Sequence, residues 1–387
     1  MEQFTNILKR NSLLLALLVV MVLFEITIRA TGHGSMFSPA NFTNIISQNS
    51  YVIILAVGML FCIIGCGNVD LSIGSIVALV GAIAGVMMVN WETNIYLAIA
   101  TCLLTGVLIG AWQGFWIAYV RIPAFIVTLA GMMLFRGLAL LVLDGLTISP
   151  FPPEYLRYFT SFVPKARADA FATTTVITAV LCLGYLGYVV WDRISKMKKG
   201  YQVDDSSTFI ITTAVVEAAL IGSGMLLASN KGIPVILILL TIIVMTYSFY
   251  ANNTVGGRRL YALGGNEKAA RLSGVNTSRI LFMTYVNMGF LSAVAALVCV
   301  ARFNSAAPTA GNGYELDAIG ACFIGGASAY GGVGTVGGAV IGAIFMGVLN
   351  NGMSILGIDA NWQRTVKGMV LLLAVVIDVL SKKRVKQ

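Results

Sequence analysis

The amino-acid sequence predicts an all-α, polytopic membrane protein. Of its 387 residues, 58% are hydrophobic and only 11% are charged, and the mean hydropathy is +0.88. Soluble domains are about 45–50% apolar and about 25% charged, so a chain of this composition could not cover its surface with polar side chains. The apolar residues also gather in stretches near the roughly 20 residues that a helix needs to cross a bilayer. These observations exclude a water-soluble enzyme, a disordered chain and a disulfide scaffold.

Twelve apolar stretches are candidates for membrane-spanning helices. Several are short or rich in glycine, so we expect about ten to twelve full crossings, with short or broken helices among them. The first stretch lacks a small-x-small cleavage site, and we expect it to remain as a helix rather than to be removed as a signal peptide. The stretches are residues 12–29, 51–67, 71–89, 95–119, 123–143, 171–191, 208–229, 233–250, 280–301, 315–329, 335–353 and 365–380.

The basic residues indicate how the chain is oriented. The formal net charge is +9, and with both termini in the cytoplasm 16 of the 25 Lys and Arg residues lie on the inner side. Inner loops of membrane proteins carry such an excess, so the charge indicates topology rather than nucleic-acid binding. Residues 1–387 then form one transmembrane domain with three longer loops. These are an outer, proline-containing loop at 144–170 and inner loops at 192–207 and 251–279.

The second half of the 251–279 loop has the pattern of a short capped helix. Asn266 suits the N-cap position, Glu267 complements the positive helix start, and Gly274 suits a left-handed residue after the helix end. A two-turn helix is not stable alone in water, so it should rest on the membrane surface, on the protein itself or on a partner. The segment comprises Gly264, Gly265, Asn266, Glu267, Lys268, Ala269, Ala270, Arg271, Leu272, Ser273 and Gly274.

A second motif, Gly67-Asn-Val-Asp-Leu-Ser-Ile-Gly-Ser75, interrupts an apolar run and then begins a new helix. Asp70 or Ser72 can cap the free backbone N–H groups of that start. A helix that begins inside a membrane must have its backbone groups satisfied, and it usually lines a cavity. Asn68, Asp70 and Ser72 therefore either cap the helix only or face a path through the membrane.

A third stretch, residues 325–342, is rich in glycine and contains Gly332-x-Gly334-x-x-Gly337. This dinucleotide-binding pattern requires a βαβ unit, and the flanking segments here are membrane helices, so we reject nucleotide binding. We expect a turn between two spans and then a helix with Gly334, Gly338 and Gly342 on one face, where small residues let helices approach closely. Gly106, Gly110 and Gly114 form the same ladder in the fourth span. Asn350 and Asn351 either bond between helices or line the path.

Four charged residues lie in or near predicted spans, where charges mark pairing or function. Arg136 lies mid-span, Asp144 follows it by about two turns, Glu217 lies in the seventh span and Asp378 near the end of the last. We favour structural pairing over substrate contact for these residues. The predicted spans carry no histidine, metal-ligand cluster or nucleophile constellation that would indicate an intramembrane enzyme, so we assign no catalytic residue, metal or bound cofactor.

Three segments resemble the permeases of ATP-binding-cassette (ABC) importers for ribose, xylose, galactose and multiple monosaccharides. They are residues 67–75, 254–274 and 320–357, within a resemblance that covers about residues 40–381. The resemblance implies that the 264–274 segment docks on a cytoplasmic ATPase and transmits its closure, while Asn68, Asp70, Ser72, Asn350 and Asn351 are candidates for the substrate path. The chain contains no phosphate-binding Gly-x-x-x-x-Gly-Lys-(Ser/Thr) loop, so ATP would be hydrolysed on another subunit.

The same resemblance implies an assembly in the bacterial inner membrane. Its parts are a second permease copy, expected to form a homodimer, the ATPase, and a periplasmic or lipid-anchored sugar-binding protein that delivers a monosaccharide near the 144–170 loop. One rival is a branched-chain amino-acid ABC permease with the same machinery. Another is an ion- or proton-coupled secondary transporter in which Asp70, Glu217 and Arg136 form the coupling site.

Overall fold

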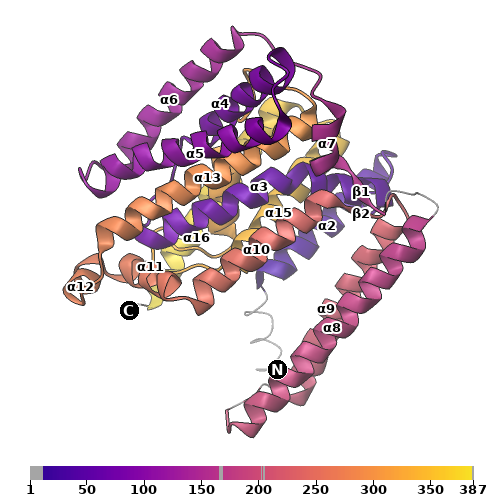
Figure 1. The fold of residues 1–387 in the computed structure, drawn as a ribbon. Coiled ribbons are helices and arrows are strands. Elements are labelled where there is room, and N and C mark those ends of the chain that lie inside the picture. Colours follow the sequence, from indigo (N-terminus) through magenta and orange to yellow (C-terminus); the bar gives the residue numbers. More distant parts are fainter. Residues whose placement is uncertain (1–11, 165–168, 202, 204, 386–387) are drawn as a thin grey trace. The chain divides into compact units, whose positions relative to one another are not determined.

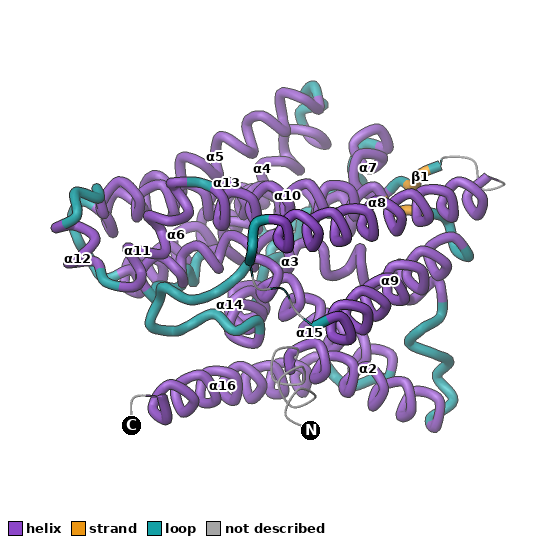
Figure 2. Tube along the Cα trace, turned by 90° about the horizontal axis from the view of Figure 1, so that it is seen from below, coloured by secondary structure: helices purple, strands orange, loops and turns teal. Residues whose placement is uncertain are grey.

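The computed structural model describes residues 12–385 except 165–168, 202 and 204, with side chains from 13 to 376. The elements of the described chain are helices joined by loops, apart from one antiparallel pair of two-residue strands, β1 (Phe162–Val163) and β2 (Ile233–Pro234), as Figure 2 shows. This confirms the predicted all-α class. Lys9, Arg10 and Asp378 lie outside the residues whose side chains are described.

Ten of the described helices are long and apolar enough to cross a membrane, which agrees with the predicted ten to twelve spans. The expected span at 315–329 is instead the 11-residue helix α14, too short to cross alone. The helices are α2 (Ser12–Ala30), α3 (Pro39–Cys66), α4 (Ile73–Gly85) with the π-helical η1 (Val86–Asn90), α5 (Ile95–Ala118), α6 (Ala124–Leu143), α7 (Pro153–Thr160), α8 (Ala170–Lys198), α9 (Ser206–Ala228), α10 (Val235–Asn253), α11 (Val255–Gly265), α12 (Glu267–Leu272), α13 (Thr277–Phe303), α14 (Tyr314–Ile324), α15 (Val336–Ile355) and α16 (Ala360–Val385).

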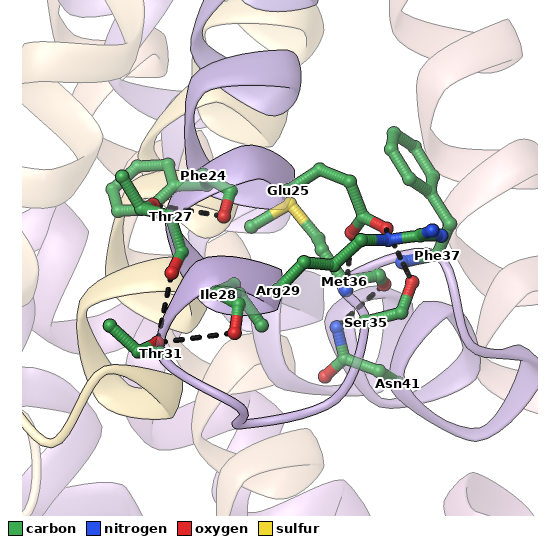
Figure 3. Close-up of polar contacts among 10 residues, drawn as sticks. All are labelled: Phe24, Glu25, Thr27, Ile28, Arg29, Thr31, Ser35, Met36, Phe37 and Asn41. Carbon is green, nitrogen blue, oxygen red and sulfur yellow. Dashed lines mark hydrogen bonds and ion pairs between the residues drawn. The ribbon is translucent and has the colours of Figure 1, made fainter.

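The described chain forms two compact units, residues 1–46 with 161–235 and residues 47–160 with 236–387. In the first unit α8 and α9 pack together as an antiparallel hairpin, and α2 carries a polar cluster at its end (Figure 1). Glu25 of α2 accepts hydrogen bonds from the Ser35 hydroxyl and the Met36 N–H, both at 2.8 Å, and pairs with Arg29 (Figure 3). The carboxylate thus fixes the connection from α2 to α3. A single domain of residues 1–387 stays a prediction.

In the second unit α13 packs along α5 and against α4, and α4 packs on α6 (Figure 1). The predicted glycine ladder of α5 forms this contact, because a Cβ added at Gly106 or Gly110 would overlap the α13 backbone at Gly289 or Tyr285. On α15, Gly338 and Gly342 likewise pack on α14. Gly334 does not belong to that ladder, since α15 begins at Val336 after its N-cap Thr335.

Two predicted boundaries differ in the structure. The helix expected at 51–67 begins at Pro39, because polar residues in its first half are bonded within the fold rather than exposed in a loop. One of them, Asn49, is buried and donates to the carbonyl of Ala343 on α15 at 2.5 Å. The charged segment at 192–207 is shorter as a loop, because α8 continues to Lys198 with an Asp192–Lys196 pair one turn apart.

Candidate functional site

The 264–274 segment forms the short helix that its capping pattern predicts. Asn266 is the N-cap of α12, and its side chain accepts a hydrogen bond from the Ala269 N–H at 3.0 Å. Gly274 has φ +81°, the left-handed conformation expected after the helix end. The first half of the loop is a helix as well, α11, whose N-cap Thr254 accepts from the Gly257 N–H at 3.1 Å (Figure 2). The sequence analysis did not predict α11.

The α12 helix turns one small side chain inward and leaves its large apolar side chain outside. Ala270 is 6% exposed, whereas Leu272 is 90% exposed. Lys268, Ala269, Arg271 and Ser273 are exposed around it. The Leu272 side chain is therefore free of contacts that would bury it within the described chain.

An ion pair holds α12 against neighbouring segments. The Arg121 guanidinium, between α5 and α6, contacts the Glu267 carboxylate at 2.7 Å and donates to the Ser278 hydroxyl at 2.9 Å. Both charges are partly exposed, so the pair contributes little stability, about 0–1 kcal/mol. Its effect is to fix the position of α12 relative to the loop between α5 and α6 and the start of α13.

Close backbone contacts join α11 to the end of α3 and to the glycine-rich loop at 325–335. A Cβ at Gly264 would overlap the Ile64 carbonyl and the Gly332 nitrogen, so only glycine fits there. The Tyr261 hydroxyl donates to the Gly334 carbonyl at 2.7 Å, and burial raises the pKa of Tyr261, which keeps this donor protonated. Gly264 therefore brings α11 into direct backbone contact with the end of α3.

The break between α3 and α4 lies inside the span. The Asp70 nitrogen lies 3.4 Å from the sulfur of Met59, seven residues before the end of α3, which corresponds to a depth of about 10 Å at 1.5 Å per residue. Asp70 Oδ1 accepts from the Ser72 N–H at 2.9 Å and from the Ser72 hydroxyl at 2.6 Å. Asp70 therefore supports the start of α4, as predicted, whereas the Ser72 side chain makes no cap.

Further polar groups from α5 and α13 surround this break. Gln113 of α5 donates from Nε2 to the Ser72 hydroxyl at 2.5 Å, and Asn68 lies within hydrogen-bonding reach of Tyr285. Asp70 and Ser72 are 0% exposed. Asp70 Oδ2 and Gln113 Oε1 have no hydrogen-bond partner among the described residues. Asn68, Asp70 and Ser72 are thus brought together with Gln113 and Tyr285 at the break, where the surrounding helices cover Asp70 and Ser72 and leave Asn68 half-buried.

The Arg136 guanidinium forms hydrogen bonds that do not involve Asp144. Its guanidinium donates to the carbonyls of Pro308 and Ala310, at 3.0 and 2.6 Å, and its electrostatic neighbour is Glu315. Asp144 instead ends α6 in a left-handed conformation. In the other unit, Glu217 of α9 lies beside Cys182 of α8.

A buried ion pair that the sequence analysis did not identify joins α14 and α16. Lys367 Nζ lies 2.9 Å from Asp317 Oδ1, and Asp317 is almost fully buried. Asn350 of α15 lies within hydrogen-bonding reach of the Asp317 carboxyl, which favours the interhelical interpretation of this asparagine. Asn351 is buried on the same helix. The residues that make these contacts lie far apart in the sequence, so no local pattern could predict them.

Comparisons with known proteins show which family the chain belongs to. Residues 41–375 match the family model described as branched-chain amino acid transport system, permease component. The xylose transport system permease protein XylH of Escherichia coli is 38% identical over 95% of this chain and 91% of its own length, and that of Haemophilus influenzae is 36% identical over 96% of each. The ribose import permease protein RbsC of Escherichia coli is 35% identical over 94% of this chain and 92% of its own length.

No solved structure matches the chain. The family match covers most of the sequence, and the relatives align over nearly their full lengths, so the similarity extends well beyond a shared motif. Ten apolar helices agree with a multi-pass membrane protein. The chain belongs to the family of permease components described for branched-chain amino acid transport systems, and it is similar over nearly its full length to the xylose and ribose permeases.

Proposed function

We propose that this chain is the transmembrane subunit of an ABC importer in the bacterial inner membrane and forms the translocation path for a monosaccharide. The observation that carries the proposal is α12, a capped helix with Leu272 outside, tied by Glu267 to Arg121 and joined through α11 to the end of α3. The family and the names of the xylose and ribose relatives support the cargo class.

The proposed assembly contains two copies of this chain, a cytoplasmic ATPase and a periplasmic or lipid-anchored sugar-binding protein. The ATPase binds α12 and hydrolyses ATP, and this chain binds no cofactor. The basic side chains around α11 and α12 support a cytoplasmic position for this end of the chain by the positive-inside rule. Both termini then lie in the cytoplasm as well.

Transport would couple to the ATPase in two steps. Closure of the ATPase moves α12 and, through the contacts of Gly264 and Tyr261, the end of α3 and the 325–335 loop. Movement of α3 relative to α4 exposes the polar groups at the break, where Asn68, Asp70 and Ser72 offer donors and acceptors to sugar hydroxyls. Asn350 and Asn351 are the corresponding candidates on α15. Weak contacts of this kind suit a path that must release its cargo.

The two alternative functions, an amino-acid permease and a secondary transporter, lead to different expectations. A branched-chain amino-acid permease would share the machinery, but the full-length relatives are named for xylose and ribose. A secondary transporter would need a charged coupling site, whereas Asp70 bonds to Ser72 and Arg136 to backbone carbonyls.

Reconstituted transport tests the proposal. The permease is placed in proteoliposomes with its ATPase and binding protein, and uptake of labelled xylose and ribose is measured against leucine. We expect ATP-dependent uptake of a pentose that leucine does not compete and an uncoupler does not reduce. Uptake of leucine, or uptake that collapses with the uncoupler while ATP is constant, would contradict it.

A further inference from the structure

A groove of about 680 Å³ lies where the end of α10 and α11 meet the start of α13. Phe61 of α3 lies at its base, and the groove extends along α13 from Asn276 to Phe290. None of its lining side chains takes part in the helix break or in the α12 surface described above. Its volume is large enough for an elongated ligand rather than a single ion.

One end of the groove is basic. Arg259 of α11 and Arg279 of α13 line it, and both are exposed. Neither forms an ion pair with another described residue, and no acidic side chain lines the groove. Two guanidinium groups at one opening are suited to an oxygen-rich anion such as a phosphate group, which arginine binds through paired hydrogen bonds.

The other end is apolar and open to the side. Arg279 and Phe290 are eleven residues apart on α13, or about 16 Å at 1.5 Å per residue. Met283 lies between them and is 50% exposed, while Phe61 is buried beneath it. The groove therefore runs from the basic end of the helices into the span, with an apolar wall that an acyl chain could follow.

A buried polar group lies along this wall. The Tyr247 hydroxyl donates to Asn287 Oδ1, and Asn287 Nδ2 is buried with no partner among the described residues. Both residues line the groove. An acceptor on a bound molecule, such as an ester carbonyl, would satisfy this donor.

We propose that this groove binds one anionic phospholipid, with the phosphate between Arg259 and Arg279 and an acyl chain along Phe61, Met283 and Phe290. An anionic head and an apolar tail are both required by the lining, and basic pockets between membrane helices on the cytoplasmic side are suited to such lipids. The lipid bridges α11 and α13. The binding site does not depend on which cargo the chain carries.

Native mass spectrometry of the purified full-length chain in detergent tests the site, with phosphatidylglycerol and phosphatidylcholine as probes. We expect a retained phosphatidylglycerol adduct and no matching phosphatidylcholine adduct. The R259Q/R279Q variant should weaken phosphatidylglycerol binding by roughly tenfold or more. The R258Q/R271Q variant removes the same charge from exposed positions outside the groove and should bind as the original chain does.

A second variant and a competitor separate the remaining explanations. Met283→Trp keeps both arginines but fills the apolar wall, and it should reduce phosphatidylglycerol binding as well. Inorganic phosphate at millimolar concentration should not displace the lipid. Equal loss in both arginine pairs, no loss in R259Q/R279Q, unchanged binding in Met283→Trp, or displacement by phosphate alone would overturn the proposal.

Discussion

The 264–274 segment and the helix break at residues 67–72 hold their shape by different means. The α12 helix is short, exposed and capped by its own residue Asn266, so its structure is local. At the break, Asp70 and Ser72 are buried, and their arrangement depends on side chains from other helices, including Gln113 of α5. The surface helix thus takes its cap from its own residue and its position from one ion pair and the buried Ala270, whereas the polar site inside the membrane depends on side chains from other helices. Substitutions should therefore affect coupling in the first region and stability in the second.

The largest expected effect in the interior comes from the Asp317–Lys367 pair. Asp317→Leu leaves Lys367 without its partner inside the helix bundle, and we expect a loss of about 3–5 kcal/mol in unfolding free energy. Thermal unfolding in detergent measures the loss. The double variant Asp317→Leu with Lys367→Met removes both charges and should recover a substantial part of it. A double variant as unstable as the single one would contradict the pairing.

The stability of the fold should be nearly as sensitive to substitution at Gly264, where α11 contacts the end of α3. Gly264→Leu forces a side chain into the Ile64 carbonyl and the Gly332 nitrogen, and we expect a loss of about 3 kcal/mol together with loss of uptake. Gly265→Ala is the matched control, because nothing lies within 4 Å of a Cβ there. Equal behaviour of the two variants, in melting temperature and in uptake, would show that α11 does not press on α3.

At the break, Asp70→Ala should cost about 1–3 kcal/mol, because it leaves the Ser72 N–H buried without an acceptor. Asp70→Asn keeps an acceptor oxygen and should lose less. Melting temperatures of the two variants give the comparison, and uptake by Asp70→Asn reports whether the charge itself serves transport. If alanine and asparagine were equally tolerated, the capping role of Asp70 would be wrong.

The smallest effect on stability is expected at the surface pair. Glu267→Arg should change unfolding free energy by no more than about 1 kcal/mol, because both partners are partly exposed. It should nevertheless reduce the ATPase activity that the loaded binding protein stimulates, since α12 loses its fixed position. The exchanged pair, Glu267→Arg with Arg121→Glu, should restore part of the stimulation. Stimulation that stays normal in Glu267→Arg would separate this ion pair from coupling.

The same contrast explains what the sequence could predict. The Asn266 cap, the left-handed Gly274 and the cap at Asp70 are local, and their residues lie within a few positions of each other. The interior contacts are not local: Lys367 and Asp317 are 50 residues apart, and Gln113 and Ser72 are 41 apart. A single sequence contains no periodic signal for such pairs.

The start of α3 shows a second reason why the sequence alone did not predict the whole structure. Its first half is polar, so its hydropathy resembles that of a loop, yet Asn49 is buried because it bonds to Ala343 on α15. The α11 helix was missed for a related reason, since Gly264 allows close contact with Ile64 and Gly332 rather than ending a helix. In both places tertiary contacts override local preference.

The central claim is that α12 docks on the ATPase, and Leu272 tests it most directly. Leu272→Ser removes a side chain that is 90% exposed, so the fold should be unaffected, and Leu183→Ser on α8 is the control at another exposed leucine, 72% exposed. In the reconstituted importer we expect the ATPase activity stimulated by sugar-loaded binding protein to fall roughly tenfold in Leu272→Ser and to remain normal in Leu183→Ser. Normal stimulation in Leu272→Ser, with the ATPase still bound, would contradict the account.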